Sequence, residues 1–405
     1  MKTQIVFAAA LTLVLSLCVL SSVHAQSLDG RKIVIEAAGQ ASVNVPVSLP
    51  FDGKAPDATV VVIDTKSKKE FPASIRDNAL VFVVDSLPAN AKMECEVKAL
   101  KEKKAPKVAI TKKGDAPVVD IIIDGQPFTS YNYSNDNKKP FLWPVYAEGK
   151  VSITRDWPMD STAPGGPDHP HHKGIFTAYG DVNGADCWDE GEKSGFQRSD
   201  DVTFGSGDAY GWIHAKNTWQ DNAHKPVIAE EREYKFYDSP ASARIFDETV
   251  TFTAAYGKVL FKDTKEGGLI AFRVRPDIQA NKGGTIVNAS GAKGEAQCWG
   301  KPSPWCDYYG TIEGVGVRGI ALFDNPTNLR HPSCWHVRNY GLNGASCFGL
   351  GAFSKNQQNG DYELAEGKTL TFHYRAVIHS GDEKQAKIAD LYADYITPPK
   401  ASWAK

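Results

Sequence analysis

The sequence predicts a mostly β protein with a small N-terminal β-sandwich, a large antiparallel, supersandwich-like β-sandwich and one C-terminal helix. Three observations predict this fold. Short runs rich in β-branched residues recur along the chain, separated by Gly, Pro, Asn and Asp. Apolar residues show a convincing helical spacing in a single stretch near the C-terminus. The 405 residues exceed one ordinary hydrophobic core, so we expect two domains.

Residues 1–25 have the pattern of a cleaved export signal. Lys2 gives a short positive region, an apolar stretch follows from Ile5 to Leu20, and Val23-His24-Ala25 resembles a cleavage site before Gln26. An uncleaved anchor is the alternative interpretation. No later segment reaches the roughly 18 uninterrupted apolar residues of a spanning helix. We therefore expect a periplasmic or secreted protein with no membrane span after cleavage.

The charge balance argues against a polyanionic partner. The 46 basic residues fall to 45 when Lys2 is removed, against 48 acidic residues, which leaves a net charge of −3. A chain so near balance is not expected to bind nucleic acid or an anionic membrane as its main partner. The nine Trp suit flat apolar ligands such as sugar faces, and equally suit ordinary β-sheet packing. A carbohydrate or another small molecule is the expected partner.

Residues 26–107 are expected to form the small sandwich. Its predicted strands are short and separated by turn-forming residues: Lys32–Glu36, Ala58–Asp64, Ala79–Asp85 and Met93–Val97. The lysine-rich segment Lys98–Lys107 is interpreted as a linker or an exposed hairpin edge.

Residues 108–405 are expected to form the large sandwich. The predicted strands are longer and alternate with long Gly-, Asn- and Pro-rich loops: Val118–Ile123, Ile175–Tyr179, Val227–Tyr237, Ala243–Ala254, Leu269–Val274, Val317–Phe323 and Lys368–Ile378. Long ordered loops on a β scaffold usually carry function. The charged run Glu230-Glu231-x-Glu233 is interpreted as a solvated strand face.

One helix is predicted close to the C-terminus. Its apolar residues fall at i, i+3, i+4 and i+7: Ile388, Leu391, Tyr392 and Tyr395. Ser380 and Glu383 fit a capping box, and Pro398-Pro399 would end the helix. We expect it to pack on a sheet without a chemical role.

Six cysteines follow the predicted signal, and an oxidising compartment would permit disulfides. Cys298 with Cys306 is the best local pair, and Cys334 with Cys347 is a second candidate. Isolated buried thiols are the alternative, since connectivity cannot be deduced from the sequence.

The run Asp168-His169-Pro170-His171-His172-Lys173 concentrates more chemistry than any other stretch of the chain. Pro170 disfavours the helical region for His169, which predicts an extended run. In an extended chain His169 and His171 would share one face, with Asp168 and His172 on the other. Such a cluster could transfer protons, bind a metal or orient a polar substrate.

Polar residues on either side of this run complete the first candidate block. Arg155 could hold a carboxylate or neutralise a developing anion, and Trp188 could stack on a sugar ring. The candidate catalytic residues are His169, His171, His172 and Arg155, and the candidate substrate-binding residues of this block are Asp168, Asp181, Asn183 and Trp188. The alternative is a polar loop whose histidines cap turns. Asp181-x-Asn183-Gly184 fails the EF-hand spacing and instead predicts an Asn-Gly hairpin turn.

A second block follows the predicted strand that ends at Phe323. Its candidate substrate-binding residues are Arg330, His331, Trp335, His336 and Arg338. We expect them to form the far wall of the same cleft, and an ordered surface loop is the alternative.

A divalent metal is left open. Two imidazoles at i, i+2 can chelate one ion, with Asp168, His331 or His336 as a third ligand. No helical His-x-x-x-His motif is present, so neither the metal nor its ligands can be assigned.

Four motifs resemble the exported bacterial family labelled PmoA-like or "methane oxygenase", over about residues 115–400. Asn325 stands where the family pattern has His, and Lys173 replaces a usual Arg. The matching motifs are Arg155-Asp156-x-Pro158, Asp168-His169-Pro170-His171-His172-x-Gly174, Gly180-Asp181-Val182-Asn183-Gly184-x-Asp186-x-Trp188 and Asp324-x-Pro326-x-Asn328-x-Arg330-His331-Pro332.

The resemblance implies a sugar-related role more than the oxidation of methane, because members of that family often accompany carbohydrate-degrading proteins. The leading expectation is an exported carbohydrate-active enzyme, a glycoside hydrolase or a polysaccharide lyase, with His171 or His169 as the proton-transfer group. One alternative is a metal-dependent oxidase or oxygenase, which tightly bound copper or iron would favour. The other is a non-catalytic glycan-binding protein, which binding without product would favour.

Overall fold

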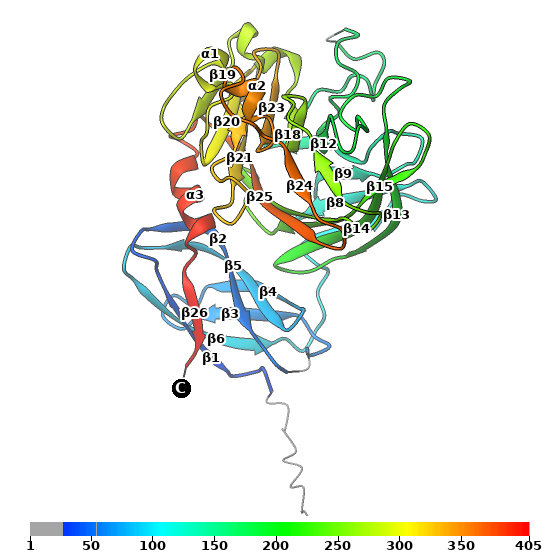
Figure 1. Ribbon diagram of the computed structural model, residues 1–405. Coiled ribbons are helices and arrows are strands. Elements are labelled where there is room, and N and C mark those ends of the chain that lie inside the picture. Colours follow the sequence, from blue (N-terminus) through cyan, green and yellow to red (C-terminus); the bar gives the residue numbers. More distant parts are fainter. Residues whose placement is uncertain (1–26, 54, 165, 405) are drawn as a thin grey trace, which may run out of the picture.

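The computed structural model describes residues 27–404 except residues 54 and 165. The predicted export signal, residues 1–25, lies outside the described residues. Within the described part, no helix is long and apolar enough to cross a membrane. Figure 1 shows two β regions, a smaller one at the N-terminus and a larger one beside it, with the C-terminal helix at their junction.

The N-terminal region is one antiparallel sheet of seven strands in the order β2-β5-β4-β3-β6-β1-β26. Its apolar side chains, among them Ile33, Val47 and Phe82, gather in a single cluster, so the sheet folds over one core. The strands are β1 (Lys32–Glu36), β2 (Ser42–Pro50), β3 (Val60–Asp64), β4 (Glu70–Arg76), β5 (Ala79–Leu87), β6 (Lys92–Ala99) and β26 (Lys400–Trp403).

The last strand of the chain belongs to this first sheet. In β26, Trp403 pairs with Ile33 of β1 and Lys400 pairs with Glu36. The indole nitrogen of Trp403 also donates to the Pro50 carbonyl at 2.8 Å. The expected boundary at residues 107 and 108 falls between β6 and the next strand. The sequence did not predict that the chain returns to the first sheet at its end.

The large region contains a nine-stranded and an eight-stranded antiparallel sheet. The first has the order β22-β23-β18-β12-β10-β9-β8-β7 with β11 paired to β10: β7 (Val108–Lys112), β8 (Val118–Ile123), β9 (Gln126–Asn132), β10 (Phe141–Ala147), β11 (Val151–Ser152), β12 (Ile175–Tyr179), β18 (Gly267–Arg273), β22 (Cys334–Trp335) and β23 (Leu342–Ser346). The second has the order β13-β14-β15-β16-β25-β21-β20-β19: β13 (Phe196–Gly205), β14 (Tyr210–Gln220), β15 (Pro226–Tyr237), β16 (Ala243–Thr253), β19 (Thr285–Asn288), β20 (Trp305–Ile312), β21 (Gly316–Asp324) and β25 (Thr369–Ser380).

The two large sheets share one hydrophobic core. Tyr131 of β9 and Phe272 of β18 lie in the same buried cluster as Tyr234 of β15 and Phe372 of β25. This arrangement confirms the predicted large antiparallel sandwich. The remaining elements are a small sheet of β17 (Val259–Phe261) with β24 (Tyr362–Leu364), the short helices α1 (Glu295–Cys298) and α2 (Leu350–Phe353), and the 3₁₀ turns Pro276–Ile278 and Ala280–Lys282.

The predicted C-terminal helix is α3 (Ile388–Ile396). Its stripe of Ile388, Leu391 and Tyr392 packs against the large sandwich, and Val83 of β5 joins the same cluster. Asp394 reaches β2, where it accepts from Ser42 Oγ at 2.8 Å. The capping-box prediction was wrong, because Ser380 ends strand β25 and the residue before the helix is Lys387.

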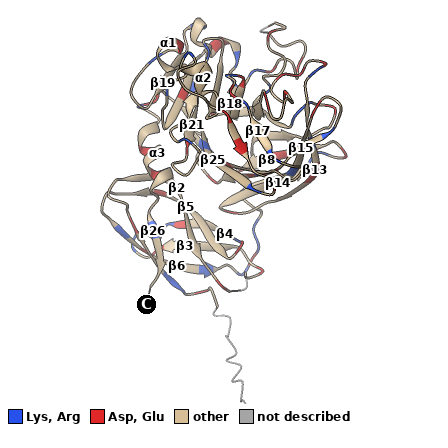
Figure 2. Ribbon diagram, viewed as in Figure 1, with Lys and Arg blue, Asp and Glu red and all other residues tan. Residues whose placement is uncertain are grey.

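Two further predictions of the sequence differ from the structure. The six described cysteines are buried and free, so neither predicted disulfide is formed. Glu230 is not on a solvated face: its side chain is fully buried and pairs with the buried Arg232 at 2.7 Å. Strand β15 lies between two neighbours, β14 and β16, and alternation turns Glu230 inward while Glu231 faces out. Acidic and basic side chains are otherwise interspersed over both regions (Figure 2).

Candidate active site

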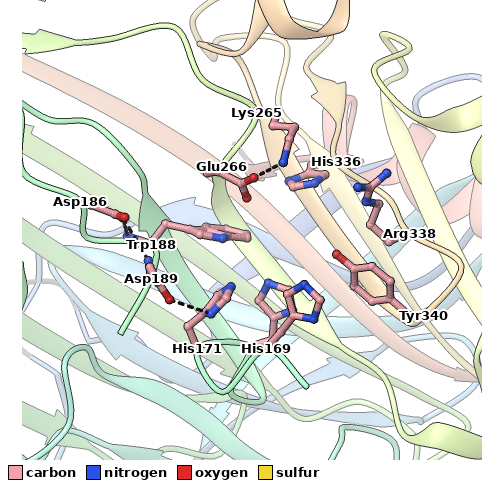
Figure 3. A pocket seen from close by; sticks show the side chains of 11 residues that line it. His169, His171, Asp186, Trp188, Asp189, Lys265, Glu266, His336, Arg338 and Tyr340 are labelled. Atoms are coloured by element: carbon pink, nitrogen blue, oxygen red, sulfur yellow. Dashed lines mark hydrogen bonds and ion pairs between the residues drawn. The ribbon is translucent and has the colours of Figure 1, made fainter. Parts of the chain in front are cut away.

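A cavity of about 340 Å³ lies beside the nine-stranded sheet, where β12, β18 and β23 are neighbours. Its lining comes from the loops on both sides of β12, the segment before β18 and the connection from β22 to β23, as Figure 3 shows. The volume is within the usual range of small-molecule pockets, roughly 300–1,000 Å³. The lining residues are His169, His171, His172, Asp186, Trp188, Asp189, Lys265, Glu266, His336, Arg338 and Tyr340.

The three clustered histidines all face this cavity. The chain makes a turn in which the His172 N–H donates to the His169 carbonyl at 3.1 Å, with Pro170 at its second position. His169 takes a φ of +46°, a conformation uncommon outside glycine. The predicted extended run, with His172 facing away from His169 and His171, was therefore wrong. The ring centroids of His171 and His172 lie only 4.3 Å apart.

Arg155 holds this turn from behind. Its side chain is fully buried, and its guanidinium donates to the backbone carbonyls of Asp168 at 2.6 Å, His169 at 2.7 Å and His172 at 3.1 Å. Burial, followed by the charge of nearby Arg273, lowers the pKa of Arg155 to about 9. The guanidinium donates to the backbone of the loop, and Arg155 does not line the cavity. Its predicted role as an anion clamp is therefore corrected to a positioning role.

Two of the histidines form carboxylate pairs. Asp168 Oδ1 contacts Nδ1 of His169, and Asp189 Oδ1 lies 3.1 Å from Nδ1 of His171. Nδ1 of His171 has no hydrogen-bond partner among the described residues, and its contact with Asp189 becomes an ion pair when the ring is protonated. Each pair leaves Nε2 of a cavity-lining ring without a hydrogen-bond partner among the described residues. Figure 3 shows Asp189 directed toward His171.

Arg273 of β18 connects the first pair to His172. Its guanidinium donates to Asp168 Oδ2 at 2.7 Å and lies 3.1 Å from Nδ1 of His172. Burial acts to raise the pKa of Asp168, but the hydrogen bond and charge of Arg273 outweigh it and hold that pKa below its usual value. The rings of His172 and Tyr340 both pack against the His169 ring, with centroids 5.0 and 4.8 Å from it and 6.3 Å from each other. His169 is thus fixed between a carboxylate and two rings.

Trp188 and His336 form the back of the cavity. Both are buried, and their rings stack at 5.9 Å with an interplanar angle of 26°. The Trp188 ring also lies 6.0 Å from that of His171, so the first and second candidate blocks meet here, as predicted. Nε1 of Trp188 and both ring nitrogens of His336 have no partner among the described residues. Buried polar atoms without partners favour a polar ligand or ordered water in the cavity.

A buried ion pair supports the loop that carries Trp188 and Asp189. Nζ of Lys139 lies 2.9 Å from Glu190 Oε1 and donates to the Trp188 carbonyl at 2.9 Å. Lys173 contacts the other oxygen of Glu190 at 2.6 Å. These contacts fix the positions from which Asp189 and Trp188 face the histidines.

Three of the imidazoles are neutral at pH 7. Burial lowers the pKa of His171 to about 4, assisted by the charge of Lys139 and opposed by Asp189. Burial lowers the pKa of His336 to about 3, and it lowers the pKa of His172 well below its usual value. Neutral rings can accept a proton or a hydrogen bond from a ligand.

Lowering the pH from 7 to 5 is expected to destabilise the fold through these rings. An unfolded histidine has a pKa of about 6.5, so the unfolded chain binds protons in this window that the folded chain does not. Stability is therefore lost as the pH falls from about 6.5 toward the folded-state pKa values. Each ring contributes roughly 1.4 kcal/mol of unfolding free energy per pH unit in this window.

Chemical denaturation of the wild type and of His336→Asn at pH 7, 6 and 5 measures this dependence. The variant should lose stability less steeply, by roughly 1.4 kcal/mol per pH unit. Burial raises the pKa of Glu248 to about 7, and its effect has the opposite sign, but it is common to both proteins and cancels in the difference. Equal slopes in the two proteins would contradict the neutral assignment of His336.

Each charged residue of the lining already has a partner. Lys265 pairs with Glu266, and Arg338 contacts Glu295 Oε1 at 2.8 Å. Asp186 accepts the backbone N–H groups of Trp188 and Asp189 at 2.9 and 3.0 Å, while burial raises its pKa. The cavity therefore offers a ligand few charged groups without a partner.

Asp181 and Asn183, predicted to bind substrate, do not line this cavity. They belong to a tight hairpin turn in which Val182 and Ala185 exchange backbone hydrogen bonds, both of 3.0 Å. Asn183 and Gly184 take positive φ values of 53° and 84°, which confirms the predicted Asn-Gly turn. The Asn183 side chain is used to bind the backbone of Lys258 and Leu260.

Only some of the candidate residues of the second block line the cavity. His336 and Arg338 line the cavity, whereas Trp335 is fully buried and donates to the Ser303 carbonyl at 2.7 Å. Arg330 donates to backbone carbonyls, including that of Gly360 at 2.7 Å. His331 lies 3.0 Å from the buried carboxylate of Asp324. These three side chains organise the loop and do not form the predicted substrate site.

The sequence did not identify Asp189, Lys265, Glu266 and Tyr340 as site residues. Lys265 and Glu266 immediately precede β18, whose first residue pairs with the last residue of β12, so they lie next to the loop that carries Asp186 and Trp188. Only the strand order reveals this, and the sequence does not give that order. For the metal left open above, residues 27–404 other than 54 and 165 contain no group of three or more His, Cys, Asp or Glu placed to hold an ion.

Comparisons with known proteins give one family and distant structures. A family model described as "Family of unknown function (DUF6807)" matches residues 118–393. The description of this family does not mention methane oxygenation, so the resemblance to the family labelled "methane oxygenase" stays a prediction. No curated protein matches the chain.

Two solved structures are similar at 10% sequence identity, an alpha-mannosidase from Enterococcus faecalis V583 and a protein in the Glycosyl Hydrolase Family 38 from Enterococcus faecalis. Their TM-scores are 0.41 and 0.40, and each alignment covers 93% of this chain. The chain spans about half the length of each, 46% and 47%. Similarity at this level assigns no activity.

Proposed function

The chain belongs to the DUF6807 family, whose function is unknown, and we propose from its site that it is a carbohydrate-active enzyme that cleaves a glycosidic bond by imidazole proton transfer. The observation that carries this proposal is the pair of carboxylate-oriented imidazoles, Asp168–His169 and Asp189–His171, in one small cavity. Their ring centroids lie 5.6 Å apart, so one bound molecule can touch both. Both Nε2 atoms are available to it.

The walls of the cavity suit a sugar. Tyr340 is partly exposed and provides flat apolar surface of the kind on which sugar rings stack, and the buried Trp188 closes the back of the cavity. Nε2 of His169 and Nε2 of His171 supply hydrogen-bonding atoms for hydroxyl groups. This mixture of rings and polar atoms is typical of a polar ligand with an apolar face.

His171 is assigned the role of general base. Its neutral imidazole can accept a proton through Nε2, and the imidazolium that forms is stabilised by Asp189 across 3.1 Å. His169 is assigned the role of proton donor to the leaving oxygen. Arg155 and Arg273 act as positioning residues, since they hold the loop and the Asp168 carboxylate.

Elimination fits this site better than hydrolysis by two carboxylates. Classical glycosidases need two available carboxyl groups facing the bond, and here Asp186, Asp189 and Glu266 each have a partner. In the elimination, His171 removes a proton from the carbon beside a carbonyl. That C–H electron pair becomes the C=C bond, the C–O bond two carbons from the carbonyl breaks, and the leaving oxygen takes a proton. Neither water nor an oxidant is consumed.

Export to the periplasm or the medium is part of this proposal. The pattern of residues 1–25 supports it, and extracellular glycans would then be accessible substrates. The methane-oxygenase label receives no support from the described side chains, which present no metal-ligand group.

The proposed reaction is tested by incubating the purified protein with oligosaccharides that carry a carbonyl two carbons from the C–O bond of the glycosidic linkage. The expected product contains a new C=C bond conjugated to that carbonyl, seen as a rise in ultraviolet absorbance and as an unsaturated fragment by mass spectrometry. Fragments heavier by one water would instead establish hydrolysis. Saturable binding without any product would establish the glycan-binding alternative and overturn the enzyme proposal.

A further inference from the structure

We infer that the carbonyl of the substrate is uncharged, an ester or a ketone, and is not a free carboxylate. This inference rests on the proposed elimination, which requires an acidic C–H beside some carbonyl group. A carboxylate, an ester and a ketone all satisfy that requirement chemically. The charges of the cavity distinguish between them.

The lining has no excess of positive charge. Its ionisable groups other than histidine are the carboxylates of Asp186, Asp189 and Glu266 and the cations of Lys265 and Arg338. The imidazoles of His171, His172 and His336 add no positive charge at pH 7, because burial keeps them neutral. The lining as a whole therefore supplies no surplus of positive charge that would attract a substrate anion.

Neither cation of the lining is free to pair with a substrate carboxylate. Lys265 contacts Glu266, the next residue in the chain, and Figure 3 shows the two side chains joined by a dashed line. Arg338 contacts Glu295 at 2.8 Å, and the second oxygen of Glu295 accepts the Asn339 N–H at 2.7 Å, which fixes it in place. A substrate carboxylate would have to displace one of these partners.

The cations behind the lining are occupied as well. Arg273 is paired with Asp168 at 2.7 Å, and Arg155 is committed to three backbone carbonyls. Placing an unpaired carboxylate in such a site carries a large desolvation cost. An ester or ketone avoids this cost, since its oxygen needs only a hydrogen bond.

Arg338 and Tyr340 can still assist the reaction of an uncharged carbonyl. Nε of Arg338 has no hydrogen-bond partner among the described residues, and the guanidinium lies 5.9 Å from the centre of the Tyr340 ring. Negative charge on the carbonyl oxygen then develops only in the transition state, where a nearby cation lowers the barrier. The site therefore suits negative charge that develops on the carbonyl oxygen in the transition state better than the permanent charge of a substrate carboxylate.

The test compares matched substrates that differ only in this group. One arm uses a methyl-esterified oligouronide and the same oligouronide after removal of the ester, and a second arm uses a glycoside oxidised to a ketone at one ring carbon. Cleavage by the wild type gives kcat/KM, and calorimetric binding to His171→Ala gives affinity without turnover. We expect at least about tenfold preference for the ester or the ketone over the free acid in both measurements.

Glu295→Gln provides the specificity control. It removes the charge that neutralises Arg338, so the free acid should gain roughly tenfold in affinity relative to its ester. Glu231→Gln, an exposed change on β15, should leave the preference as in the wild type. The inference is overturned if the wild type binds the free acid as well as or better than both uncharged ligands. It is also overturned if the wild type binds none of the three. Preferential binding of an uncharged ligand without product formation sustains it while overturning the proposed reaction.

Discussion

His171→Ala is expected to lower kcat by roughly 10²–10⁴-fold, the usual size of a general acid–base contribution, while the protein stays folded. The reason is that His171 offers a neutral imidazole to the cavity, with Asp189 placed to stabilise the protonated ring. Folding should be little affected, because the ring lies on a loop and carries no core packing. Steady-state kinetics on the substrate identified by the product assay measures the change.

Three outcomes separate the possible roles of His171. A proton-transfer role predicts low kcat, intact folding and partial recovery when free imidazole is added. A metal-ligand role predicts that a chelator inactivates the wild type as well. A purely structural role predicts lower stability with unchanged activity per folded molecule. His214→Ala, a partly exposed histidine of β14 outside the cavity, is the matched control and should behave as the wild type. Full activity in folded His171→Ala and again in His169→Ala would end the catalytic interpretation of this cluster.

Arg155→Met is expected to lower both stability and activity. The change leaves the carbonyls of Asp168, His169 and His172 without their charged donor in a buried site, at a cost of about 1–3 kcal/mol for each group left unpaired. The turn that directs the histidines into the cavity would then relax. A displacement of about 1 Å in catalytic groups can lower the rate about 10²-fold.

Denaturation midpoints and kcat, measured on the folded fraction, separate these two effects. Arg275→Met is the matched control, because Arg275 also donates to a backbone carbonyl, that of Ser152 at 2.9 Å, but makes no contact with the histidine turn. Had Arg155 been an anion clamp, its loss would raise KM and leave the unfolding free energy unchanged. That pattern would contradict the positioning role.

The sequence predicted the C-terminal helix and several strands because their signals are local, but it did not predict others such as β9, β10, β13 and β14. β8 and β12 match the predicted bounds, and the apolar stripe from Ile388 to Tyr395 forms α3. Alternation and helical spacing depend only on neighbouring residues. Glu230 illustrates the limit of such signals: a charged residue was assigned to the surface, but a central strand placed it beside a buried Arg232.

The candidate site was predicted in part, for a different reason. His169, His171, His172, Trp188, His336 and Arg338 were identified because they are chemically distinctive residues in two loops, and the structure brings them together. Tyr340 and Glu266 were missed, since their part in the site depends on β23, β18 and β12 being neighbours in the sheet. Arg155 was assigned to substrate because residue type alone cannot distinguish a guanidinium that binds a ligand from one that binds the backbone.

Strand β26 has a consequence for how the chain assembles. It pairs with β1, from the opposite end of the described chain, and Trp403 lies over the guanidinium of Arg31 at 3.6 Å from the ring centre. Contacts between such distant residues form late, since the intervening chain must first become compact. Until then the outer edge of β1 is an unpaired strand, of the kind that recruits other chains. Because β26 directly follows α3, the edge of the N-terminal sheet is closed by a strand whose position depends on the large sandwich and α3.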